Sequence, residues 1–158
     1  MGFHEEVCEG KMKKEIFILF VVFMLPSGIV AEDSPTASLS VSISGLRSSR
    51  GQVCVALFNS DRGFPAERKN AYRESCGRVE NKKSFVKFQN IPQGEYAAFA
   101  FHDEDSDRKL KSNWIGMPKE GVGASRNAKG VMGPPSWDDA KFAISGPEHR
   151  IAIKLTYL

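Results

Sequence analysis

Three acidic residues at alternate positions give the sequence its most distinctive chemistry. Asp103, Asp105 and Asp107 follow His102 directly, and Glu120 lies further along the chain. The D-x-D-x-D spacing is typical of loops in which a tightly turning backbone brings alternate carboxylates onto one calcium ion. We therefore predict a metal site formed by Asp103, Asp105, Asp107 and Glu120, with calcium as the cofactor.

The residues that follow favour a second interpretation, in which the segment is a solvated acidic turn without a metal. The sixth loop position, which is glycine in helix-loop-helix calcium sites, is Arg108 here, and the twelfth, usually a bidentate glutamate, is Trp114. Arg108, Lys109 and Lys111 then neutralise the acidic residues. Both interpretations remain open from the sequence.

A hydrolase-like enzyme is the alternative function. His102 with Asp103 or Glu120 would supply a base and an acid, which makes His102 and Glu120 the candidate catalytic residues. Adjacent residues of a strand point to opposite faces, however, so His102 and Asp103 are not paired by their proximity in sequence. Neither a G-x-S-x-G nor an H-E-x-x-H pattern occurs. The sequence favours binding over catalysis.

Polar and aromatic residues of the same segment are candidates for ligand binding. Tryptophan rings stack on sugars, but large aromatic residues are more often mostly buried, so Trp114 and Trp137 are expected to cover the ends of the fold. A small ligand, a glycan and a protein are the partners considered. The candidate ligand-binding residues are His102, Asn113, Trp114, Ser125 and Asn127.

Length and composition indicate one globular domain. The chain has 158 residues, of which 41% are hydrophobic and 26% charged, and its net charge is +3. A nucleic-acid-binding protein normally concentrates its basic residues in a patch or stripe. No such run stands out, so nucleic acid is excluded as a partner.

The N-terminal residues predict export. Basic residues between Lys11 and Lys14 precede the apolar run Ile16–Leu25, and Ala31 stands at the expected cleavage position. A membrane-spanning helix needs about 20 apolar residues, so this run is too short to anchor the protein. We predict that residues 1–31 are a removed signal peptide and leader extension, with Met1 or Met12 as the start. Residues 32–37 would be flexible, and residues 38–158 would form a periplasmic or extracellular domain without a membrane span.

The predicted cleavage removes one of the three cysteines and leaves two in the mature chain. Cys8 lies in the removed segment, which leaves Cys54 and Cys76. Cysteines in an exported chain form disulfides by default, because the compartment is oxidising. We predict a Cys54–Cys76 disulfide rather than a metal site, because two cysteines without nearby histidines are a poor ligand set.

The elements that must position these residues are β-strands. Leu39, Val41 and Ile43 alternate with serines, as in a half-buried strand, whereas Gln52–Phe58 is apolar almost throughout, as in a strand covered on both faces. The residues Ile91–Gly94 predict a turn. The further expected strands are Ser84–Phe88, Glu95–Phe101, Ala140–Ile144 and Arg150–Tyr157.

Between the strands, only Ala66–Glu74 has a composition that allows a helix. Two long segments, Asn59–Lys83 and His102–Asp139, are expected to be loops. Parallel sheets need crossover helices, which the sequence lacks. We therefore predict an all-β fold, a single antiparallel β-sandwich of prealbumin-like or immunoglobulin-like type with two long loops and an N-terminal signal segment.

The stretch His102–Asn127 resembles the hallmark of a secreted bacterial family of uncharacterised proteins, the domain of unknown function numbered two-one-four-one, whose pattern is close to HDxNxNGKLDxNxxGxPxEGxGxSxN. The segment Gly133–Phe142 is similar to that family's GPPSFxxAxF segment. This chain departs from the pattern at Arg108, usually glycine, and Lys111, usually aspartate, and Asp105 and Asp107 stand in slots that the pattern gives as asparagine. The positions that carry the resemblance are His102, Asp103, Asp107, Lys109, Leu110, Asn113, Gly116, Pro118, Glu120, Gly121, Gly123, Ser125 and Asn127.

The resemblance implies an exported prealbumin-like β-sandwich and no particular activity. Its two departures fall inside the acidic loop, which suggests that a metal bound in relatives is weakened or lost here. Alternatively, the Asp103–Glu120 segment is a structural brace, in which the carboxylates accept backbone N–H groups of the glycine-rich loop. We therefore expect an exported binding or accessory domain that contacts its ligand through residues 102–127, with or without bound calcium. A hydrolase and a purely structural domain are the alternatives.

Overall fold

A computed structural model of the chain describes residues 35–131 and 133–158. The predicted signal peptide, its cleavage near Ala31 and residues 32–34 of the expected flexible segment 32–37 lie outside the described residues. The first strand, β1, spans Thr36–Ser44, and Ala37 is already buried in the core. The folded region thus begins two residues before the expected boundary at residue 38.

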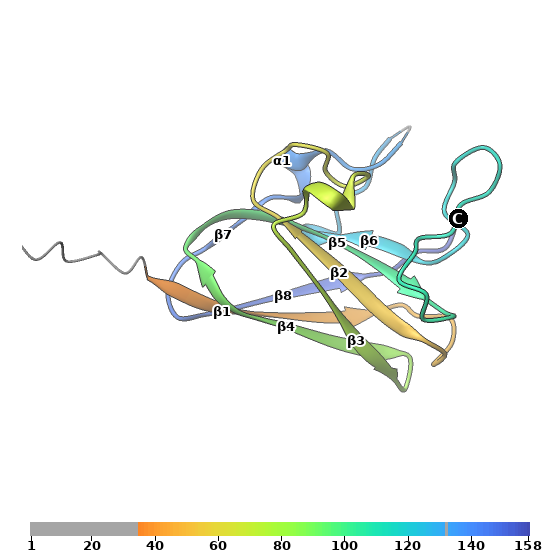
Figure 1. Ribbon diagram of the computed structural model, residues 1–158, viewed down its shortest axis with the longest axis horizontal. Coiled ribbons are helices and arrows are strands. Elements are labelled where there is room, and N and C mark those ends of the chain that lie inside the picture. The colour runs from red at the N-terminus through yellow and green to blue at the C-terminus, as the bar shows by residue number, and fades with distance from the viewer. Residues whose placement is uncertain (1–34, 132) are drawn as a thin grey trace, which may run out of the picture. The chain divides into compact units, whose positions relative to one another are not determined.

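Eight strands and three short helices make up the described part of the chain (Figure 1). The strands pair in the order β6-β5-β2-β3-β4-β1-β8, and β7 pairs with β5. The helices are η1 (Arg68–Asn70), η2 (Ser125–Asn127) and α1 (Trp137–Ala140). After β1 the strands are β2 (Gln52–Phe58), β3 (Arg73–Glu80), β4 (Lys83–Pro92), β5 (Gly94–Asp103), β6 (Val122–Ala124), β7 (Phe142–Ile144) and β8 (Glu148–Lys154).

The strands form one mixed sheet whose two edges meet. Beyond β8, Thr156 exchanges two hydrogen bonds of 2.9 Å with Val122 of β6, which joins the last strand in the order to the first. All neighbouring pairs are antiparallel except β1 and β8, which are parallel. The all-β prediction is confirmed, whereas the antiparallel sandwich is not, since the strands form a single, nearly closed mixed sheet. Periodicity identifies the buried face of a strand and says nothing about its partner.

Side-chain alternation builds the core. Leu39, Val41 and Ile43 of β1 are buried, and the intervening serines are at least partly exposed. β2 is buried at six consecutive positions. One of its faces meets the main core, and its other face packs with Phe99 and Phe101 of β5. The predicted half-buried and doubly covered strands are therefore both confirmed.

The expected loop Asn59–Lys83 contains a strand. β3 pairs with β2 from Arg73 to Arg78 and with β4 beyond that, although only Val79 of its eight residues is buried. A strand held by ladder hydrogen bonds between two neighbours needs no apolar alternation of its own, so periodicity could not reveal it. Within Ala66–Glu74, whose composition allows a helix, the structure has only the short helix η1.

The second long segment also contains short elements. β6 and α1 lie within the expected loop His102–Asp139, and α1 ends at Ala140, where a strand was expected to begin. The Ser136 hydroxyl caps α1 by accepting the Asp139 N–H, a side-chain cap that local sequence can specify. β7 starts two residues later, at Phe142.

Candidate functional site

The acidic segment begins as a tight turn closed by one buried carboxylate. Asp103, at the end of β5, is fully buried. One oxygen accepts the N–H of Asp107 at 3.1 Å, and the other accepts the N–H of Arg108 at 2.8 Å and the side-chain amide of Gln52 at 2.7 Å. These three donors satisfy a buried charge that would otherwise be costly. The Gln52 amide ties the turn to β2.

Arg108 has a left-handed backbone, with φ of 61°. Residues other than glycine lose about 1–2 kcal/mol in this conformation because the Cβ atom crowds the following carbonyl. Glycine is free of this penalty. The turn geometry therefore accounts for glycine at this position in the resembling pattern without requiring a metal ion.

A second buried carboxylate secures the other end of the segment. Glu120, which is 4% exposed, accepts the N–H of Glu104 at 3.3 Å and the N–H of Lys111 at 3.0 Å, one on each oxygen. Asp103 and Glu120 together hold four backbone amides of the loop. We refer to these two carboxylates and the amides they accept as the carboxylate brace. This geometry matches the structural-brace interpretation of the sequence.

Three of the four predicted metal ligands converge. Oxygen atoms of Asp103, Asp105 and Glu120 lie within 4.8 Å of one another. Asp107 is not part of this group, and its carboxylate accepts the N–H of Lys109 instead. Asp105 forms an ion pair with the ammonium of Lys111, whose hydrogen bond lowers the pKa of the Asp105 carboxyl.

The three clustered carboxylates are better placed to accept hydrogen bonds than to coordinate a calcium ion. Calcium takes about six to eight oxygen ligands, whereas the cluster offers three carboxylates, two of which already accept backbone N–H groups. The Lys111 ammonium also brings a positive charge beside Asp105, where a cation would have to bind. The brace accounts for the position of every buried carboxylate in the cluster.

His102 is buried and fully engaged. Its Nε2 lies 2.8 Å from the carbonyl oxygen of Arg50, which can only accept, so Nε2 carries the proton. Its Nδ1 accepts from the hydroxyl of Tyr157 at 2.7 Å, and this hydroxyl in turn accepts the N–H of Arg47 at 3.0 Å. Burial raises the pKa of the Tyr157 hydroxyl, consistent with its role as a donor. His102 is thus fully buried and Glu120 is 4% exposed, and both side chains are occupied by hydrogen bonds within the fold.

An ion pair absent from the sequence predictions links the first turn to the acidic segment. Arg47 donates to both oxygens of Glu104, at 3.0 and 2.5 Å, and its guanidinium stacks over the ring of Tyr157 at 4.7 Å. The hydrogen bonds from Arg47 and Ser48 lower the pKa of the Glu104 carboxyl to about 2. Arg47 lies more than fifty residues upstream in a polar turn, so no local pattern marks it as part of the site.

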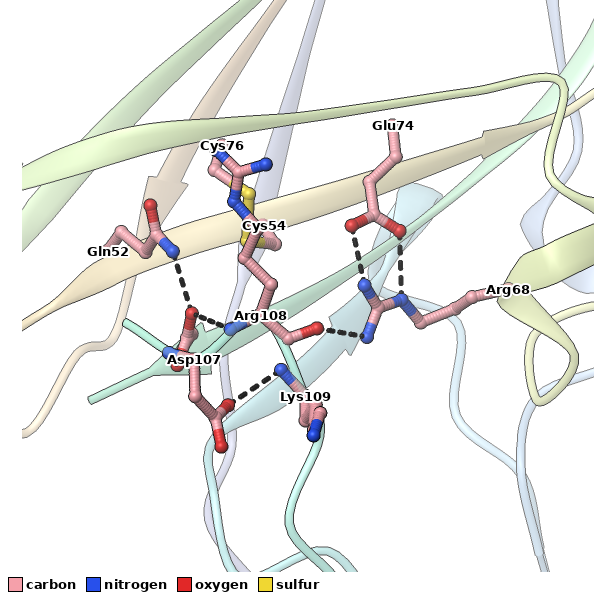
Figure 2. The surroundings of a disulfide bond; sticks show 9 residues. Gln52, Cys54, Arg68, Glu74, Cys76, Asp107, Arg108 and Lys109 are labelled. Carbon is pink, nitrogen blue, oxygen red and sulfur yellow. Dashed lines mark hydrogen bonds and ion pairs between the residues drawn. A yellow bond between two sulfur atoms is a disulfide. The ribbon is translucent and has the colours of Figure 1, made fainter. Parts of the chain in front are cut away.

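The disulfide lies beside the acidic turn (Figure 2). Cys54 and Cys76 are opposite each other on β2 and β3 and are bonded at 2.04 Å, which confirms the predicted pairing. Arg68 lies over the ring of Phe101, forms a two-pronged ion pair with Glu74, and donates to the carbonyl of Arg108 at 3.1 Å. Arg68 thus holds the acidic turn in addition to Asp103 and Glu120.

Beyond the brace, residues 111–119 form a hydrogen-bonded hairpin, which we call the tip hairpin. Its legs are joined by bonds of 2.8 Å from Lys119 N–H to Lys111 carbonyl and from Asn113 N–H to Met117 carbonyl. The Asn113 side chain accepts the N–H groups of Ile115 and Met117, so this candidate ligand residue serves the turn itself. Figure 1 shows the teal loop projecting away from the sheet.

The tip hairpin exposes apolar side chains. Trp114 is 95% exposed, Ile115 56% and Met117 42%. Six large hydrophobic residues are exposed in the described part of the chain, and these three lie within four consecutive positions. Lys111 and Lys119 are exposed on the two legs, and Lys109 is exposed just before the first leg. The expectation that Trp114 covers an end of the fold is wrong, whereas the partly buried Trp137 packs against Phe64.

Ser125 and Asn127 both form hydrogen bonds that hold the fold together, although Ser125 is buried and Asn127 is exposed. The buried Ser125 hydroxyl donates to the Ala140 carbonyl at 2.6 Å and accepts the Ala98 N–H at 2.9 Å. Asn127 accepts the N–H of Lys154 at 2.8 Å. These residues fasten η2 to β5, α1 and β8, and their recurrence in the resembling pattern reflects the fold.

No helix among residues 35–131 and 133–158 is long and apolar enough to cross a membrane. No curated protein matches the chain. Among solved structures, two crystal structures of the pilus-presented adhesin Spy0125 (Cpa) match at 12% and 11% identity, both with a TM-score of 0.24. The matches cover 77% of this chain and 27% of the adhesin chain, so the chain spans about a quarter of its length.

The family comparison covers most of the folded region. The family model described as "Uncharacterized protein conserved in bacteria (DUF2141)" matches residues 41–152, from the middle of β1 to the middle of β8. The matched range includes the carboxylate brace, the tip hairpin and both disulfide cysteines. The chain belongs to this bacterial family, as the resemblance of its acidic segment indicates.

Proposed function

We propose that this protein is an exported binding domain and that the tip hairpin is its contact surface. The observation that carries the proposal is the 95% exposure of Trp114 on a hairpin that is itself hydrogen bonded. Export, with cleavage near Ala31, is part of the proposal. The Cys54–Cys76 disulfide supports it, because disulfides persist in oxidising compartments.

Exposed apolar side chains that cluster on a projecting element favour an interaction site over a structural role. Clustered apolar surface marks binding sites more often than isolated exposed residues do, and tryptophan is enriched among residues that dominate binding energies. The hairpin is already ordered by Asn113 and the carboxylate brace. Little conformational entropy is then lost when a partner binds.

The alternatives have weaker support. A hydrolase would need His102 within reach of a substrate, and that residue is buried with both ring nitrogens bonded. Calcium binding is supported by the convergence of Asp103, Asp105 and Glu120, and it stays the alternative role for the brace. A purely structural domain leaves the exposure of Trp114, Ile115 and Met117 unexplained.

Site-specific photo-crosslinking in the bacterial host tests the proposal. A benzoylphenylalanine residue replaces Trp114 in one variant and Phe85 in a matched control, because Phe85 is an aromatic residue that is 59% exposed on β4. We expect adducts to protein, glycan or lipid from position 114 only. Adducts from neither position, or equally from both, would refute the tip hairpin as the contact surface.

A further inference from the structure

We infer that the partner of the tip hairpin is a lipid bilayer carrying anionic headgroups, into whose interface Trp114, Ile115 and Met117 insert. The inference rests on the proposed function and names its partner. It predicts peripheral, reversible attachment through one hairpin, distinct from any membrane-spanning segment.

The chemistry of the tip matches the boundary between headgroups and acyl chains. Trp114 has a large apolar ring with one polar N–H, the combination that places tryptophan at membrane interfaces. Ile115 and Met117 beside it are purely apolar. A glycan site would use hydrogen-bonding groups around the aromatic ring, and these two exposed neighbours offer none from their side chains.

The charges around the tip are complementary to an anionic surface. From Arg108 to Lys119 the sequence contains four basic residues and no acidic ones. Lys111 and Lys119 are exposed on the two legs, and Lys109 is exposed just before the first leg. Of the nearby acids, Glu120 is buried in the brace, Asp105 pairs with Lys111, and Asp107 is exposed at the root. Lys109, before the first leg, and Lys119, on the second leg, thus supply positive charge.

The size of the surface favours a bilayer over a protein. A stable protein interface buries about 800 Å² on each partner, over roughly 20–30 residues. Three apolar side chains on a projecting hairpin fall well short of that. Interfacial membrane attachment needs only a small inserted apolar area together with electrostatic attraction.

Trp114 provides a local readout. The chain has two tryptophans, so Trp137→Phe leaves Trp114 as the single emitter. The full chain is mixed with vesicles of phosphatidylcholine alone or of phosphatidylcholine with phosphatidylglycerol. We expect a blue shift of Trp114 emission and quenching by brominated acyl chains with the anionic vesicles. Because the signal comes from residue 114, membrane contact by residues 16–25 does not mimic it.

Two sets of variants, each with a matched control, test whether the lysines and the apolar tip residues cause the vesicle binding. Lys109→Gln with Lys119→Gln should raise the lipid concentration for half-maximal shift at least tenfold, since each lysine near such a surface contributes roughly fivefold. Lys83→Gln with Lys87→Gln, on β4, is the matched charge control and should have little effect. Ile115→Ser with Met117→Ser should weaken insertion, whereas Phe85→Ser should not.

The results separate the two proposals. No shift with anionic vesicles, or an equal shift with both vesicle types that the lysine variants leave unchanged, would overturn the membrane inference. If position 114 still crosslinks to a protein or glycan in cells, the binding function stands without the bilayer. If Trp137→Phe unfolds the domain, fluorine NMR of the unsubstituted chain labelled with 5-fluorotryptophan measures the same insertion through the Trp114 resonance.

Discussion

The carboxylate of Asp103 accepts the backbone N–H of Arg108 at 2.8 Å, and Arg108 reaches this bond by adopting a left-handed backbone. The buried side chain and the strained residue are five positions apart and define one turn. Asp103 stabilises the conformation that the Cβ of Arg108 disfavours. The hydrogen bond from Arg108 to Asp103 and the unfavourable backbone of Arg108 together set the path of the chain toward the first leg of the tip hairpin.

Arg108→Gly should stabilise the domain. Relief of the left-handed backbone is worth about 1–2 kcal/mol, and the added freedom of glycine in the unfolded chain costs about 0.5–1 kcal/mol. We expect a net gain of roughly 0.5–1 kcal/mol in the free energy of unfolding, measured by urea denaturation. Arg78→Gly, within β3, is the control and should destabilise, because its φ is not positive. A loss of stability in Arg108→Gly would contradict the turn geometry.

Asp103→Asn should loosen the tip hairpin. The amide keeps one acceptor but turns an NH₂ group toward the donors of Arg108 and Gln52, which leaves buried donors without an acceptor. The expected loss is about 1–3 kcal/mol. Amide hydrogen exchange should show reduced protection at Lys119 and Met117. The exposed Asp107→Asn is the matched control, with an expected change within about 0.5 kcal/mol.

The Arg47–Glu104 pair should make stability depend on acid pH. The pKa of Glu104 is lowered to about 2 in the folded protein from a reference value of 4.5, chiefly by the hydrogen bond from Arg47. A lowered carboxyl pKa contributes stability above the unfolded value, and this contribution is lost as the pH falls from about 5 to 2. Because half of the Arg47 side chain is exposed, solvent screening limits the effect to about 1 kcal/mol.

Urea denaturation between pH 6 and pH 2 measures this contribution. Glu104→Gln should flatten part of the acid-side decline relative to the unsubstituted chain. Glu148→Gln removes a similar charge from an exposed ion pair with Arg150 and should leave the slope unchanged. Identical pH profiles for Glu104→Gln and the unsubstituted chain would argue against a coupled Arg47–Glu104 pair in solution.

Calcium should leave the melting temperature unchanged. The brace already supplies N–H donors to Asp103 and Glu120, and Lys111 provides the positive charge beside Asp105. A site that bound calcium only in the folded state would add about 2.7 kcal/mol at a concentration of 100 Kd. Melting temperatures measured in calcium, in magnesium and in a chelator decide between a brace without metal and a calcium site. A calcium-specific rise that Asp105→Asn abolishes would establish the alternative role.

The sequence pattern predicted those elements whose conformation and burial are determined by their own residues. The alternation around Val41 and the continuous apolar run of β2 specify their structure within a few residues. The turn expected at Ile91–Gly94 is limited to Gln93, between β4 and β5. β3 and the parallel pairing of β1 with β8 depend on neighbours far away in the chain. The same distance explains why Arg47 and Tyr157 could not be placed around His102 in advance.

The acidic segment shows why a site is harder to predict than a strand. Alternate aspartates converge equally well on a cation or on the backbone amides of a tight turn, so the spacing of Asp103, Asp105 and Asp107 does not separate the two. The exposure of Trp114 depends on the length and direction of a hairpin fixed by Asn113. Residue type alone favoured burial.

The two bonds between Val122 and Thr156 have a mechanical consequence for a domain held by one hairpin. A force on Trp114 enters the sheet where β5 ends and β6 begins. β6 is only three residues long, but the bonds to Thr156 give it a second neighbour beside β5. On the other side, Gln52 passes load into β2, which the disulfide cross-links to β3. Tension on Trp114 would thus be shared among strands from both ends of the fold, and the three residues of β6 would not bear it alone.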